Sequence, residues 1–117
     1  MNKEFCLENQ FKCHANIQTT LNVIGGKWKP IILWHLLEGK KRFSELQRSI
    51  SGVSQKMLTA QLRELEQDLI IHREVYKQIP PKVEYWVTDY GKTLQPVLES
   101  IGNWGQKHSQ KPTQPVL

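Results

Sequence analysis

The stretch that decides the fold runs from Ser54 to Glu66 and reads SQKMLTAQLRELE. Leu58, Leu62 and Leu65 recur at helical spacing, and Leu69 continues the series, so one face of this segment is predicted to be buried. Ser54 is a residue type that favours the N-cap position. We therefore predict a helix that starts after Ser54 and ends near residue 68 or 69.

The opposite face of this helix carries short polar and basic side chains. They can donate and accept hydrogen bonds as base edges in the DNA major groove require. An ordinary solvent-facing helix is the alternative interpretation. Acidic residues follow only at positions 64, 66 and 68, which we expect to face away from DNA. The candidate base-contacting set is Ser54, Gln55, Lys56, Thr59 and Arg63, with Ala60 among them.

Three helices are predicted before this one. The first spans Ala15–Ile24 and ends at Gly25-Gly26. The second, Pro30–Glu38, is apolar on nearly every side and is expected at the centre of the core. After a short basic connector, residues 40–43, that forms at most one short strand, Ser44 begins the third helix, with Gln47 at capping-box spacing.

Two β-strands and a last helix are predicted after residue 69. Residues 70–77 and 83–88 are rich in β-branched residues, and the prolines between them, which cannot join a strand ladder, belong at a hairpin tip. Thr88 is expected to cap a helix over residues 89–106, which Pro96 should kink. The element order indicates an α+β, mainly α fold: a winged helix-turn-helix with a β-hairpin wing. We expect one domain over residues 1–117, with a flexible arm at about 1–12 and a flexible tail at 108–117.

The positive charge is concentrated in one segment. Between residues 27 and 56, seven basic residues stand against two acids, an excess equal to the formal net charge of +5. A basic segment on a neutral scaffold indicates a polyanionic partner, here double-stranded DNA, although a solvated surface would show the same pattern. The wing could lie along phosphates or be only a rigid Pro-Pro turn. The candidate phosphate contacts are Lys40, Lys41, Arg42 and Ser44, and on the wing Lys77, Pro81 and Lys82.

Several classes of protein are disfavoured. The longest apolar run, residues 31–37, is too short to span a bilayer, and the N-terminus lacks the apolar stretch of a signal peptide, so we expect a cytoplasmic protein without membrane contact. Glycine-rich phosphate loops and the HExxH and GxSxG motifs are absent, which argues against an enzyme and against a cofactor. Cys6, Cys13 and His14 could form part of a metal site, but no CxxC or HxxxH spacing accompanies them, and no metal is expected.

An ordered set of motifs resembles one known family. The motifs are NVIGGKW at 22–28, RFSEL at 42–46, SQKMLT at 54–59, LRELE at 62–66, PPKVEY at 80–85 and TDYG at 88–91. Together they are similar to the HxlR-type family of bacterial winged-helix transcriptional regulators. One departure is Leu69, where the family usually has a glycine that accepts a left-handed backbone.

The resemblance implies a homodimer built from the first and last helices. These helices offer apolar side chains that a small core is not expected to use in full, although completing the monomer core is the alternative. The predicted interface residues are Leu21, Ile24, Leu98, Ile101 and Trp104.

Cys13 matches a position at which some members of this family sense oxidants or electrophiles. It is expected just before the first helix, beside Lys12 and His14, where a helix N-terminus and cations favour the reactive thiolate. The alternative is a small buried apolar side chain. Cys6 could act as a resolving thiol. We therefore predict a sequence-specific transcriptional regulator with an oxidant or electrophile as candidate effector, and the alternative function is a winged-helix protein-interaction module.

Overall fold

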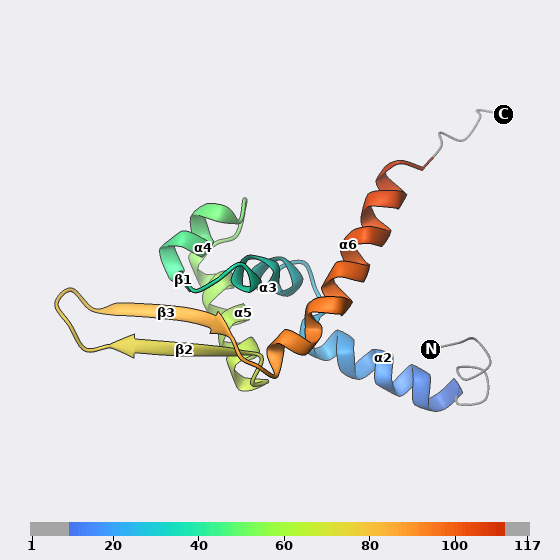
Figure 1. Ribbon diagram of the computed structural model, residues 1–117, viewed down its shortest axis with the longest axis horizontal. Coiled ribbons are helices and arrows are strands. Elements are labelled where there is room, and N and C mark those ends of the chain that lie inside the picture. Colours follow the sequence, from blue (N-terminus) through green and yellow to red (C-terminus); the bar gives the residue numbers. More distant parts are fainter. Residues whose placement is uncertain (1–9, 112–117) are drawn as a thin grey trace.

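The computed structural model describes residues 10–111. The chain forms helices around a small sheet, with a β-hairpin projecting at one end and the first and last helices extending from the opposite side (Figure 1). The elements are α2 (Gln10–Ile24), α3 (Lys29–Leu37), β1 (Lys41–Arg42), α4 (Phe43–Ser49), α5 (Gln55–Gln67), β2 (Ile71–Tyr76), β3 (Lys82–Val87), the 3-10 helix η1 (Gly91–Leu94) and α6 (Gln95–Ser109). This is the predicted winged helix-turn-helix, with α4 and α5 as the helix-turn-helix and β2–β3 as the wing.

The core forms where the helices meet the sheet. Helix α3 contributes Ile32, Leu33 and Leu36, all fully buried, because its sequence is apolar on most sides. Helix α5 contributes the predicted leucine stripe, and the sheet closes the cluster from the other side. The α5 and sheet residues of the cluster are Leu58, Leu62, Leu65, Ile71, Tyr85 and Val87.

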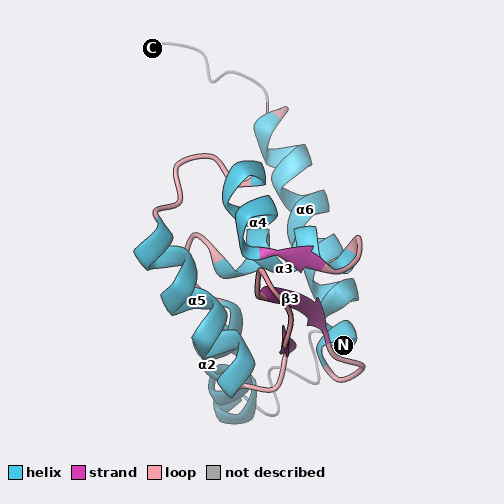
Figure 2. Cartoon of the chain, turned by 90° about the vertical axis from the view of Figure 1, so that its left-hand side faces the viewer, coloured by secondary structure: helices cyan, strands magenta, loops and turns pink. Residues whose placement is uncertain are grey.

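The three strands form an antiparallel sheet in the order β1-β3-β2. In the hairpin Ile71 pairs with Val87 and Arg73 with Tyr85, so these four side chains share the face that packs on the helices. Helix α5 contacts β2 of the hairpin, and Figure 2, seen from the hairpin end, shows α5 on one side of the sheet. Side chains of α5 and of the wing therefore line a common hollow.

The turn between α5 and the wing depends on a left-handed residue. Leu69 has φ +63 and its side chain is 68% exposed. The prediction that Leu69 continues the buried stripe is wrong, because the left-handed backbone turns the chain out of the helix and directs this side chain to solvent. The structure thus keeps, with leucine, the backbone conformation for which glycine is usually required.

The C-terminal helix differs from its prediction. Pro96 was expected inside a long helix that it would kink, but η1 occupies residues 91–94 and α6 begins at Gln95. Pro96 therefore lies in the first turn of α6, where its missing N–H costs no hydrogen bond. Thr88 does cap this region, since its hydroxyl accepts a hydrogen bond from the Gly91 N–H at 2.9 Å.

Three expected boundaries also change. Helix α2 begins at Gln10 and not at the predicted Ala15, so residues 10–12 of the expected arm are helical; residues 1–9 lie outside the described part. Helix α6 runs to Ser109, so residues 108 and 109, which were expected in the tail, are helical. Residues 112–117 lie outside the described part. Helix α4 is capped at Arg42, whose N–H donates to Glu45 Oε1 at 2.9 Å, and not by the predicted Ser44–Gln47 pair, because the helix starts earlier.

Candidate DNA-binding surface

Helix α5 presents its polar face at the surface. The Ser54 hydroxyl caps the helix by accepting a hydrogen bond from the Met57 N–H at 3.1 Å, as predicted. The leucine stripe anchors the opposite side in the core, so the polar face must point outward. An open hollow of about 670 Å³ brings the predicted base-contacting residues together, and its lining consists of Ser54, Gln55, Lys56, Thr59, Ala60 and Arg63.

Most of these side chains are available for a ligand. Within residues 10–111, the side chains of Gln55, Lys56 and Arg63 form no hydrogen bond or ion pair. Thr59 differs, because its hydroxyl donates to the Gln55 carbonyl oxygen at 2.8 Å. Thr59 can therefore offer a base its methyl group and an acceptor, but its donor is already engaged.

The basic residues before α4 are partly engaged within the chain. Lys40 Nζ lies 4.3 Å from the centroid of the Trp86 ring, and Lys41 Nζ lies 3.7 Å from a Glu38 carboxylate oxygen. Arg42 and Ser44 are exposed. The lysines are thus held at the edge of the sheet, and their ammonium groups stay near the surface.

The wing presents its cations unequally. Lys77 and Pro81 are exposed at the tip, as expected. Lys82 is half-buried, with Nζ 3.7 Å from Glu84 and 5.1 Å from the centroid of the Tyr76 ring. Glu84, as a hydrogen-bond acceptor of the Tyr76 hydroxyl, raises the pKa of Tyr76 above its usual value, with smaller contributions from burial and from the charges of Glu84 and Glu74. Lys82 therefore stabilises the wing through these two contacts in addition to carrying a positive charge. Tyr76 stays neutral at ordinary pH.

Arg73 on β2 is a cation that the sequence prediction omitted. It lines a second hollow, of about 260 Å³, between α5 and the sheet, together with Arg63 and Glu66. Strand alternation was the available signal, because Arg73 shares the helix-facing side with Ile71. Of the late acids of α5, Glu66 lies in this hollow, and Glu64 pairs with the buried Lys29 at 2.6 Å.

A separate set of exposed apolar side chains lies on the helices that extend away from the wing. Leu21, Ile101 and Trp104 are exposed there, as the predicted interface requires. Ile24 and Leu98 are only 3% and 6% exposed and pack into the monomer core, so their contribution to an interface stays a prediction. Sequence reasoning missed Ile31 and Trp34 of α3, because a helix apolar on all sides does not reveal which side is buried. These two side chains and Ile101 line a hollow of about 590 Å³ between α3 and α6.

Cys13 lies inside α2, not before it. The helix starts three residues earlier than Cys13, and the thiol-bearing residue is half-buried. It still lies within the first turn, where the helix dipole favours a negative charge. Cys6 lies outside the described residues.

Among residues 10–111, no group of three or more His, Cys, Asp and Glu side chains is placed to hold a metal ion. No helix in the same range is long and apolar enough to cross a membrane.

The helix-turn-helix, the outward polar face of its second helix and the hairpin beside it together define a winged helix-turn-helix protein. The chain matches the HxlR-like helix-turn-helix family over residues 23–113, and it belongs to this family. The family and the relatives below are DNA-binding transcriptional regulators and not enzymes.

Three relatives illustrate this similarity. The HTH-type transcriptional regulator YdeP of Bacillus subtilis (strain 168) is 56% identical over 95 residues, which cover 81% of this chain and 74% of YdeP. The crystal structure of the HTH-type transcriptional regulator ytcD matches with a TM-score of 0.78 at 54% identity, covering 81% of this chain and 97% of that one. The redox regulator HypR in its oxidized form matches with a TM-score of 0.76 at 50% identity, covering 86% of this chain and 99% of that one.

Proposed function

We propose that this protein is a sequence-specific DNA-binding regulator of transcription that acts as a homodimer and responds to oxidants through Cys13. The observation that carries the DNA-binding proposal is the outward polar face of α5. Its leucines are locked in the core, while Gln55, Lys56 and Arg63 point outward without any partner in the described chain. Side chains of this chemistry match base edges in the major groove. The protein would act where duplex DNA is found, in the cytoplasm.

In the proposed complex, α5 enters the major groove with its N-terminal end and the wing lies beside it on the backbone. The exposed cations Arg42 and Lys77 lie on the segments that flank α5 in this arrangement, at the start of α4 and at the wing tip. Contacts of this kind set the position of a protein on the duplex, and contacts to base edges set its specificity.

The test is binding of the reduced protein to duplex DNA from its own upstream region, measured across a salt series. An unrelated duplex of equal length is the comparison. We expect tighter binding to the upstream DNA, with affinity falling steeply as salt rises. Absence of binding to either duplex would refute the proposal and favour a winged-helix module that contacts other proteins.

The homodimer proposal is supported by the apolar face of α2, α3 and α6. Side chains there remain exposed although the core is complete, and apolar patches of this kind mark interfaces. The exposed members are Ile17, Leu21, Ile31, Trp34, Val97, Ile101 and Trp104. A second copy of this chain, related by a two-fold axis, would cover the face and present two α5 helices to a two-fold DNA site.

Sedimentation analysis of an Ile101→Glu variant tests the dimer. A buried, unpaired carboxylate at the centre of the interface is expected to convert the dimer to monomer. Ile79→Glu is the matched control, because Ile79 is fully exposed at the wing tip and its substitution should leave the dimer intact. If both variants sediment as the unmodified protein does, the apolar face is not the interface.

The redox proposal is supported by the half-buried position of Cys13 in the first turn of α2 and by the similarity to the redox regulator HypR. A Cys13 thiolate would attack a peroxide and become a sulfenic acid, with the second peroxide oxygen leaving as water or alcohol. Because α2 carries part of the apolar face, this change would alter how two copies hold their α5 helices. DNA binding of Cys13→Ser should be insensitive to mild peroxide, while Cys6→Ser keeps the response; an unchanged response in Cys13→Ser would refute this role.

A further inference from the structure

The hollow between α5 and the wing has the composition of an anion site. Its lining consists of Thr59, Leu62, Arg63, Glu66, Arg73 and Tyr85. Two arginine residues, Arg63 on a helix and Arg73 on a strand, line the same space of about 260 Å³. Guanidinium groups stay charged at any physiological pH and hold phosphate oxygens through paired hydrogen bonds.

Neither arginine is committed to a partner within the chain. In residues 10–111, the Arg63 and Arg73 side chains form no hydrogen bond and no ion pair, even with the Glu66 carboxylate in the same hollow. The two positive charges therefore exceed the single negative charge, and their hydrogen-bond donors are unused. A cleft with this balance attracts an anion of one or two charges.

Tyr85 adds a neutral donor to the same hollow. The residue is only 8% exposed, its ring belongs to the core, and its hydroxyl forms no hydrogen bond within residues 10–111. No buried side-chain polar atom in that range lacks a partner, so the Tyr85 hydroxyl must be accessible. An accessible hydroxyl on a rigidly packed ring can donate to a bound oxygen without loss of side-chain freedom.

The position along α5 separates this cleft from the base-contacting end. Arg63 lies about 12 Å along the helix axis beyond Gln55, at roughly 1.5 Å per residue. The major groove is about 8.5 Å deep, so a helix that enters with its N-terminal end leaves Arg63 outside the floor of the groove, near the rim where the phosphates lie.

We propose that Arg63, Arg73 and Tyr85 form a phosphate-binding cleft that clamps one backbone phosphate of duplex DNA between α5 and the wing. The inference rests on the proposed DNA-binding function and changes the role of Arg63 from reading a base to holding the backbone. It also assigns a DNA contact to β2 of the wing, away from the wing tip.

Anisotropy titrations with the upstream duplex and with an unrelated duplex test the cleft. Removing one phosphate contact lowers the slope of log affinity against log salt by about 0.9. For Arg63→Ala and Arg73→Ala, the loss of affinity relative to the unmodified protein should therefore shrink about 3.5-fold between about 50 and about 200 mM salt, on both duplexes alike. Lys107→Ala on α6 removes the same charge far from the cleft and should leave the slope unchanged.

Two conservative variants separate binding from folding. Arg73→Lys keeps the charge and is expected to keep the slope, whereas Tyr85→Phe keeps the ring and should weaken binding to both duplexes about five-fold without changing the slope. Glu66→Gln removes the only carboxylate of the hollow and should tighten binding to both duplexes, a gain that a folding defect cannot produce.

The outcomes distinguish this inference from the proposed function. If the unmodified protein binds DNA but Arg73→Ala keeps the full salt slope, or if Arg63→Ala weakens only the upstream duplex, the cleft does not hold a phosphate. If the unmodified protein binds neither duplex, the proposed function fails and this inference fails with it. Inorganic phosphate, added at constant ionic strength, should compete with DNA for the unmodified protein but not for Arg73→Ala, and this result would further support the site.

Discussion

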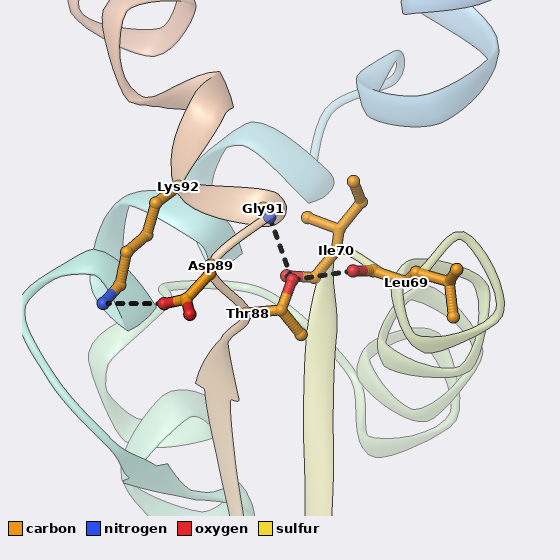
Figure 3. Close-up of polar contacts among 6 residues, drawn as sticks. All are labelled: Leu69, Ile70, Thr88, Asp89, Gly91 and Lys92. Atoms are coloured by element: carbon orange, nitrogen blue, oxygen red, sulfur yellow. Dashed lines mark hydrogen bonds and ion pairs between the residues drawn. The ribbon is translucent and has the colours of Figure 1, made fainter.

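Replacing Gly91 by alanine should disrupt the junction between the wing and the C-terminal helix. At this junction the Thr88 hydroxyl donates to the carbonyl oxygens of Leu69, at 2.7 Å, and of Ile70, at 3.1 Å, and it accepts a hydrogen bond from the Gly91 N–H (Figure 3). The end of α5, the start of β2 and the start of η1 are thereby joined through one side chain. The backbone at Gly91 consequently passes directly against Ile70.

A methyl group at position 91 has no space. Its carbon would overlap the Ile70 carbonyl oxygen and lie 2.8 Å from Val87 Cγ1, closer than side chains tolerate. The two backbone segments would have to separate, which costs about 1–3 kcal/mol by analogy with overpacked cores. Weakening the hydrogen bond between Thr88 and Gly91 adds about 1 kcal/mol. We expect Gly91→Ala to lower the free energy of unfolding by about 3 kcal/mol, and the thermal midpoint by roughly 10–15 °C.

Urea unfolding followed by tryptophan fluorescence and by circular dichroism measures this loss at fixed protein concentration, since a dimer makes stability concentration-dependent. Gly105→Ala on α6 is the matched control, because beyond its chain neighbours and the backbone of α6 nothing lies within 4 Å of the added carbon. That substitution should raise stability by about 0.5–1 kcal/mol through helix propensity. A Gly91→Ala protein within about 0.5 kcal/mol of the unmodified one would refute the close-approach argument, since surface-like effects have that size.

Three further outcomes follow from the same structure. Lys29 is only 7% exposed, so Glu64→Ala leaves a buried lysine without its carboxylate and should cost about 1–3 kcal/mol in urea unfolding; an unchanged midpoint would show that solvent replaces the pair. Leu69→Val should destabilise by about 1 kcal/mol, because a β-branched residue tolerates a positive φ poorly, whereas Leu69→Asn should not; equal stabilities would contradict the left-handed turn. Gln55→Ala should cost about 1–3 kcal/mol on the upstream duplex and little on unrelated DNA; equal losses on both would remove Gln55 from base recognition.

The order and type of the elements could be read from the sequence wherever periodicity was strong. The leucines of α5, the alternating strands and the prolines between them predicted the helix-turn-helix and the hairpin correctly. Helix boundaries were predicted less accurately, because neighbouring residues compete for the capping position. Arg42 and Glu45 cap α4 in place of Ser44 and Gln47. Pro96 was assigned to the interior of a helix because the sequence does not show that a 3-10 turn separates residues 91–94 from α6.

The polar face of α5 was determined by the sequence alone, because three leucines at helical spacing leave the remaining side chains only one direction to point. The tertiary structure decided the rest of the surface. It buried Ile24 and Leu98 but left Ile31 and Trp34 exposed, a choice that depends on which neighbours pack against each helix and not on hydrophobicity. It also brought Arg73 beside Arg63, because the α5–β2 turn at Leu69 folds the wing back along the helix, and a contact between distant segments has no signature in either segment by itself.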